Sequence, residues 1–191
     1  GYLQINTGST PLWRTFSGVD NPTDVEDAEL RHVLERAVRY EDNPHAAVSE
    51  IRYAIQVAGG NTNRVVSLMK QLIVEGTEDA ETDMFYISEI GKYGTSSDLP
   101  FLYQKVTTAD YCASATEAIL RIEGLATNSL TQIMSSLPDS PRGNKKSAYA
   151  WCRILDVVTK SPSGEPIRTF ALSNAVQFVS RQTESADWLD R

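Results

Sequence analysis

Histidine and cysteine are scarce in this chain, whose 191 residues include two of each. His32 and His45 lie thirteen residues apart, and Cys112 and Cys152 form no CxxC pair. Transition-metal sites need several such ligands at short spacing, so the composition argues against a metal centre. We expect both histidines to be exposed. We expect both cysteines to be buried free thiols with no disulfide between them.

The motifs of common catalytic and nucleotide-binding sites are also absent. The sequence contains no G-x-G-x-x-G, no P-loop, no G-x-S-x-G and no H-E-x-x-H. Each of these motifs supplies a phosphate cradle, a nucleophile or metal ligands. We therefore expect no catalytic residue, no bound metal and no cofactor.

Long apolar runs and excess positive charge are lacking too. No run reaches the roughly 18 residues that span a bilayer, so no membrane span is predicted. Residues 1–95 carry 8 Lys and Arg against 15 Asp and Glu, and residues 96–191 carry 10 of each kind. The net charge of −7 repels phosphate backbones and argues against nucleic-acid binding. Because residue 1 is Gly rather than Met, we expect a chain that was either processed or cut from a longer one, so a signal peptide or lipid anchor could have preceded it. The sequence does not fix the compartment, and the missing Met favours a secreted, periplasmic or cell-envelope protein.

Apolar residues recur with helical spacing along most of the chain, and no stretch shows the alternation of a strand. Glycines such as Gly59, Gly60 and Gly76 are predicted to end helices. The predicted helices cover residues 23–40, 43–58, 63–74, 98–106, 109–122, 128–137, 144–159 and 166–181, with one more between the acidic residues near 80 and Gly94. The predicted class is all-α. Residues 1–22 are predicted to form an irregular segment packed on a single domain of residues 23–191.

Four carboxylates, those of Glu78, Asp79, Glu81 and Asp83, crowd the start of one predicted helix. Carboxylates at this end interact favourably with the helix dipole. The same cluster could be interpreted as a cation site. Helix capping accounts for it without a metal, and we prefer that interpretation.

Four isoleucines mark a repeat. Aligning AIQVAG, EIGKYG, AILRIEG and RILDVV brings Ile55, Ile90, Ile119 and Ile154 into register, at separations of 35, 29 and 35 residues. A period in this range is typical of stacked helical hairpins, in which each unit buries its apolar face against its neighbours. We expect all four isoleucines to be buried at equivalent positions.

The pattern of short helix, turn and longer helix resembles the HEAT-repeat family. Gly closes each unit, Leu99-Pro100 opens one, and the apolar positions from Ala113 to Ile122 form the longer helix of the closest stretch. The resemblance covers residues 44–160. It implies a right-handed α-α superhelix of about four HEAT-like hairpins with capping helices.

In that family the second helix of each hairpin lines a concave face, and the resemblance implies the same here. Residues five before, one before and two after each aligned isoleucine should then share this face, partly exposed. The candidate binding residues are Phe85, Glu89, Lys92, Arg121, Tyr149 and Arg153. Aromatic residues and arginine are enriched where proteins bury surface, so the predicted partner is a protein or peptide. Glu89 and Arg121 are expected to pair between successive units.

Other functions stay open from the sequence. HEAT-like proteins include phycobilin lyases, so the resemblance also allows an enzyme with a lyase-like pocket. They include DNA-alkylation glycosylases as well, but these have basic grooves, which disagrees with the net charge of −7. The missing Met start allows a structural domain of a cell-envelope protein. The candidate face could also be a solvated surface with weak ion pairs. The predicted function is a non-catalytic binding or scaffold module.

Overall fold

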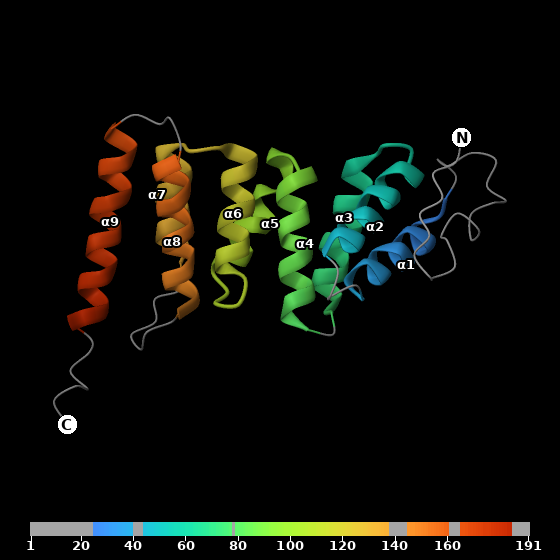
Figure 1. Ribbon diagram of the computed structural model, residues 1–191, viewed down its shortest axis with the longest axis horizontal. Helices are drawn as coiled ribbons and strands as arrows, with labels where there is room; N and C mark the ends of the chain where they lie inside the picture. The colour runs from blue at the N-terminus through green and yellow to red at the C-terminus, as the bar shows by residue number, and fades with distance from the viewer. Residues whose placement is uncertain (1–24, 40–43, 78, 138–144, 161–164, 185–191) are drawn as a thin grey trace, which may run out of the picture. The chain divides into compact units, whose positions relative to one another are not determined.

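The computed structural model describes residues 25–39, 44–77, 79–137, 145–160 and 165–184 (Figure 1). This described part consists of nine α-helices and one 3-10 helix, with no β-strand. The predicted all-α class is therefore confirmed. The helices are α1 (Asp27–Val38), α2 (Pro44–Val57), α3 (Thr62–Glu75), α4 (Ala80–Tyr93), η3 (Ser96–Asp98), α5 (Leu99–Val106), α6 (Cys112–Glu123), α7 (Thr127–Ser136), α8 (Lys145–Lys160) and α9 (Glu165–Glu184).

The chain divides into two compact units, Gly1–Leu68 and Met69–Arg191, and the boundary falls inside α3. The irregular segment predicted for residues 1–22 lies outside the described residues. The single domain predicted for residues 23–191 stays a prediction. Among the described helices, none combines the length and the apolar character that crossing a membrane requires.

Glycines stand at the helix ends where the sequence predicts them. Gly59 and Gly60 follow α2 with φ of 67° and 80°. Gly76 follows α3 with φ of 92°. This left-handed backbone conformation favours glycine and stops the helix.

The start of α4 confirms the capping interpretation for one member of the acidic cluster. The Asp79 carboxylate accepts a hydrogen bond from the backbone N–H of Thr82 at 2.6 Å. Glu81 and Asp83 lie in the first turn of the same helix. Glu78 lies outside the described residues.

In the first unit, α1 packs on α2. The core positions of α2 step by four and then three residues, through Ala47, Ile51 and Ala54. Ile55 follows Ala54 by about 100° around the helix, which turns its side chain away from the centre of this face. Ile55 is therefore only half-buried, and its predicted burial is wrong.

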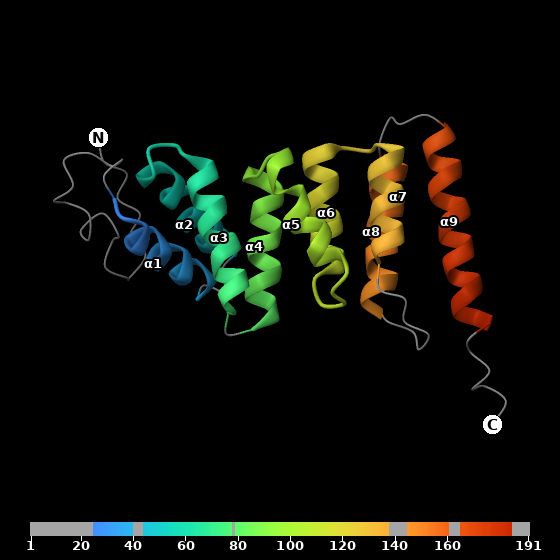
Figure 2. The ribbon, with the colours of Figure 1, turned by 180° about the vertical axis from the view of Figure 1, so that it is seen from behind.

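In the second unit, α4, α6 and α8 lie side by side and run in the same direction, with α6 between its two neighbours (Figure 1). Helices α5 and α7 lie on the other side of this row and are in front when the molecule is turned by 180° (Figure 2). Ile90, Ile119 and Ile154 are each 0% exposed, one on each helix of the row. The predicted burial is confirmed for these three isoleucines.

The backbones of α4 and α6 approach closely at Gly91. A Cβ atom added there would lie 2.6 Å from Cα and 2.7 Å from Cβ of Ala118. Those distances are shorter than any normal carbon contact, so no larger residue fits without moving a helix. The small residue pair thus sets the spacing of α4 and α6.

The cysteines and histidines, which are scarce in this chain, differ in how far they are buried. Both cysteines are free, but only Cys112 is buried, so the predicted burial of Cys152 is wrong. Cys152 precedes the core residue Ile154 by two positions, about 200° around α8, and therefore points away from the core. His32 and His45 are exposed, as predicted.

Candidate binding surface

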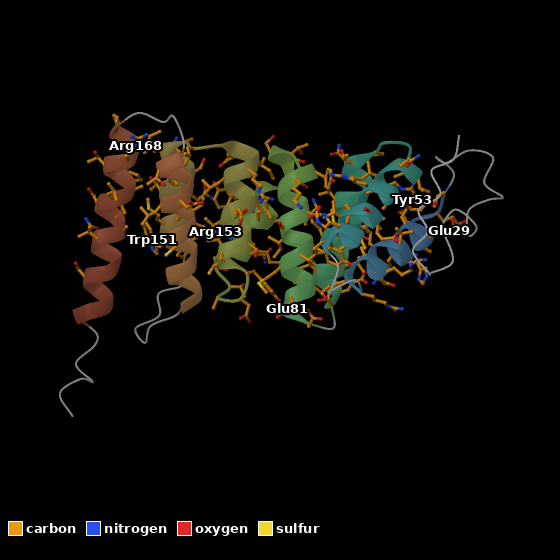
Figure 3. All side chains as sticks on the ribbon, viewed as in Figure 1. Glu29, Tyr53, Glu81, Trp151, Arg153 and Arg168 are labelled. Atoms are coloured by element: carbon orange, nitrogen blue, oxygen red, sulfur yellow. The ribbon has the colours of Figure 1, made fainter. Side chains whose placement is uncertain are left out.

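Two of the predicted site residues, Arg121 and Arg153, come from neighbouring helices and converge on one carboxylate. Nη2 of Arg121 donates a hydrogen bond to Oε1 of Glu117, one turn earlier on α6, at 2.5 Å. Nε of Arg153 on α8 lies 3.8 Å from Oε2 of the same glutamate. Figure 3 shows the side chain of Arg153 between α8 and α6. We call Glu117, Arg121 and Arg153 the Glu117 cluster.

The Glu117 cluster is partly open to solvent. The side chains of Glu117, Arg121 and Arg153 are 31%, 39% and 40% exposed. Ion pairs at this exposure contribute at most about 1 kcal/mol to folding. Glu117 is thus shared by guanidinium groups from two helices.

Two other predicted site residues, Glu89 and Lys92, form an ion pair within α4. Lys92 is 38% exposed, but the side chain of Glu89 is only 2% exposed, so its predicted partial exposure is wrong. Oε2 of Glu89 accepts no hydrogen bond from the described residues. The predicted pair between Glu89 and Arg121 is also wrong, because Lys92 and Glu117 are their respective partners.

The burial of Glu89 follows from the packing of α4 on α6. Glu89 and Ala118 both lie one residue before an aligned isoleucine, and each is 1% exposed. That position therefore faces into the packed row on both helices. Lys92 and Arg121, two residues after the isoleucines, are 38% and 39% exposed, so the second predicted position does reach the surface.

Of the two aromatic residues of the predicted site, Phe85 and Tyr149, the structure describes the side chain of Phe85 alone. Phe85 is half-buried. The centroid of its ring lies 5.8 Å from the ring centroid of Tyr86, and the angle between the two ring planes is 53°. The side chain of Tyr149 lies outside the described residues. Its place on the surface stays a prediction.

Sequence reasoning missed Glu117, the residue that joins the two arginines. Its spacing of four residues from Arg121 is a known signal for an ion pair on one helix face. That spacing alone could have identified the pair within α6. The approach of Arg153 depends on the rotation of α8 against α6, which no local pattern contains.

A second cluster of polar residues, separate from the Glu117 cluster, is centred on Asp98. Its carboxylate accepts hydrogen bonds from Nζ of Lys70 at 2.5 Å and from the backbone N–H of Thr95 at 2.9 Å. Burial alone would raise the pKa of Asp98, but these hydrogen bonds outweigh it and hold the pKa below its ordinary value. This arrangement closes the capping box of η3, so its role is structural.

A third group surrounds Asp83, which is 6% exposed. Its two oxygens accept hydrogen bonds from the hydroxyls of Thr77 at 2.8 Å and Tyr111 at 2.7 Å. The hydrogen bond to Asp83, helped by burial, raises the pKa of the Tyr111 hydroxyl. Asp83 thus ties the turn before α4 to the turn before α6.

One tyrosine of α5 is held in its neutral form. Burial, followed by the hydrogen bond that it donates to Glu123 at 2.9 Å, raises the pKa of Tyr103 to about 12. A phenol with this pKa is a poor proton donor near neutral pH. Tyr103 therefore joins α5 to α6 and is unsuited to acid–base chemistry.

The described residues hold no group of three or more His, Cys, Asp or Glu placed to bind a metal ion. Comparison of the chain with protein-family models, with curated proteins and with solved structures finds no significant match. The site must therefore be interpreted from its own geometry.

Proposed function

We propose that the protein is a non-catalytic module that binds a protein or peptide on the face of α4, α6 and α8 that carries Lys92, Arg121 and Arg153. In this proposal the helices form a HEAT-like solenoid of about four hairpins. Support comes from the common direction of α4, α6 and α8 and from the equivalent burial of their isoleucines.

The observation that carries the proposal is the Glu117 cluster. Two arginines from different helices meet at the surface, although 32 residues separate them in the chain. The pairing contributes little to folding at this exposure. Arginine is enriched in interfaces because its planar guanidinium group donates several hydrogen bonds and also stacks on apolar groups. A half-buried aromatic ring, that of Phe85, is available on α4.

The proposal is tested by selection from a phage-displayed library of random peptides on the immobilised full chain. The test variant is the double reversal Arg121→Glu with Arg153→Glu. The control variant is Arg31→Glu, because Arg31 pairs with Glu35 on α1 with the same four-residue spacing and similar exposure. We expect peptides that bind the wild type and Arg31→Glu but not the double reversal.

Thermal and urea unfolding of each variant serves as the check on folding, with shifts in unfolding free energy of less than about 0.5 kcal/mol expected for single surface substitutions. Selected peptides that bind the double reversal as tightly as the wild type would rule out this face. Failure to select any peptide would count against a peptide-binding function.

A further inference from the structure

The carboxylate of Glu89 on α4 is paired at only one of its two oxygens. The side chain is 2% exposed, and Oε1 is paired with the ammonium group of Lys92, one turn later on the helix. Oε2 is buried as well and accepts no hydrogen bond from the described residues. A buried carboxylate oxygen without a donor costs free energy, because its lost hydration is not replaced. Glu89 therefore favours a partner that reaches both oxygens.

Lys92 shows that a side chain at the surface can reach this carboxylate. The ammonium group is a compact point charge, and it pairs with Oε1 alone. The Lys92 side chain is 38% exposed, so it extends from the solvent to the buried acid. A ligand side chain of similar length can follow the same path when Lys92 turns outward, where water hydrates its charge.

We propose that the bound peptide carries an arginine and that Glu89 is the buried acceptor of this arginine. This inference rests on the proposed function and adds the chemical class of the partner. The forked, planar guanidinium group donates two parallel hydrogen bonds to a carboxylate, so it pairs with Oε1 and Oε2 together. Lys92 gives up its single pair in exchange. Arg121 and Arg153 contact other residues of the same peptide.

The charge around Glu89 favours a basic partner. The 14 residues of α4 include three acidic residues and one basic residue. Residues 1–95, which contain α4, carry 8 Lys and Arg against 15 Asp and Glu. This excess of negative charge attracts a cationic peptide and repels an acidic one. The orphaned oxygen and the local charge thus point to the same class of ligand.

The experiment measures fluorescence anisotropy of a labelled hexaarginine peptide titrated with the full chain. It is run at about 0.15 M salt, where attraction between exposed charges is largely screened beyond about 8 Å. Labelled hexalysine has the same charge without the forked donors, and labelled hexacitrulline has a similar shape without the charge. Circular dichroism and thermal unfolding check that each variant is folded.

Three variants test the role of Glu89. Glu89→Gln removes the buried acceptor charge and keeps the side-chain shape. Glu81→Gln is its matched control, because it removes the same charge from an exposed residue of the same helix. Lys92→Arg leaves the net charge unchanged and brings a guanidinium group of the chain itself to Glu89, where it competes with the peptide.

We expect saturable binding of hexaarginine, binding of hexalysine that is about two- to fivefold weaker, and no binding of hexacitrulline. Glu89→Gln should lower the affinity for hexaarginine about tenfold or more and remove the preference over hexalysine. Glu81→Gln should change the affinity less than about twofold. Lys92→Arg should lower it about two- to fivefold, although the charge of the protein is the same.

Three results would overturn the inference. One is the absence of hexaarginine binding by the wild type. Another is an equal loss in Glu81→Gln and Glu89→Gln, which would indicate a general charge effect. The third is binding by Lys92→Arg that is as tight as binding by the wild type.

Failure of this inference is distinguishable from failure of the proposed function. If the peptide library yields ligands that the double reversal loses while hexaarginine does not bind, the face binds peptides and only the arginine anchor is wrong. If no selected ligand depends on Arg121 and Arg153, the proposed function itself fails.

Discussion

Glu89 carries a carboxylate where only 1% of the residue is reached by water, and its one described partner is Lys92. Burying a charge costs several kcal/mol unless pairing and hydrogen bonds offset the lost hydration. Here Lys92 pairs with Oε1, and no described residue donates to Oε2. The pair is therefore asymmetric, with a buried acid and a half-exposed base.

This asymmetry predicts opposite results for the two partners. Lys92→Met should lower the free energy of unfolding by about 1–3 kcal/mol, because it leaves the buried carboxylate without a countercharge. Solvent screening at the partly exposed Lys92 keeps the loss in this range. Glu89→Met keeps a similar volume, removes the buried charge and should be neutral or stabilising. Urea denaturation at neutral pH measures both. Arg121→Met, at an exposed pair, is the control. Equal losses in the two Met variants would mean that the pair is not dominated by burial of Glu89.

At the scale of elements, Asp98 connects two helices through one side chain. It closes the capping box of η3 with Thr95 and also pairs with Lys70 of α3. Gly94 is part of the same arrangement, because a Cβ atom there would lie 2.6 Å from the carbonyl oxygen of Ile90 and 3.1 Å from the Asp98 carboxylate. The turn between α4 and α5 therefore depends on a charged Asp98.

Stability should depend on the charge of Asp98 in acid. The pKa of Asp98 lies below the ordinary value of 3.8 in the folded protein. The stabilisation is therefore fully present above that ordinary value and is lost as the pH falls through the lower, folded pKa. Asp98→Asn should unfold at lower urea concentration at pH 7, and the difference from the wild type should shrink as the pH is lowered below about 4. Urea unfolding across pH 2.5–7 measures this, with Glu81→Gln, at an exposed acid of α4, as the control. A constant difference over the whole range would contradict the assignment.

The ends of the helices could be predicted from the sequence because the signals that set them are local. Gly59, Gly76 and Asp79 act through their own backbone or within one helical turn. The sequence predicts less accurately which side of each helix is buried than where the helix ends. Ile55 and Glu89 differ from expectation because the rotation of a helix depends on its neighbours. A shift of one residue turns a side chain by about 100°.

The candidate site has the same mixture of local and non-local origin. Lys92 and Arg121 reach the surface because both lie two residues after an isoleucine that is fully buried, a relation visible in the sequence. The contact of Arg153 with Glu117 requires α6 and α8 to pack at a particular angle. Helical spacing predicts the first kind of feature and carries no information on the second.

At the scale of the whole molecule, the division into two compact units can be compared with the single domain predicted from the repeat. In stacked repeats each unit is stabilised by its own core and by its immediate neighbours, so damage to one unit spreads only over a limited distance. Compact units with separate cores behave in a similar way. A single cooperative domain would respond as a whole to the loss of one core side chain.

Truncation of Ile119 distinguishes these cases. Ile119 is 0% exposed on α6, which packs against both α4 and α8, so Ile119→Ala should lower the free energy of unfolding by about 2–5 kcal/mol. Native-state hydrogen exchange read by mass spectrometry should then speed up in those three helices and stay unchanged in α1 and α2. Ile55→Ala is the matched control: at a half-buried position it should have a smaller effect, confined to the first unit. Faster exchange in every helix of Ile119→Ala would show one cooperative domain. The two units would then be parts of a single folding unit, because a cavity in α6 could reach α1 and α2 only through a shared unfolding transition.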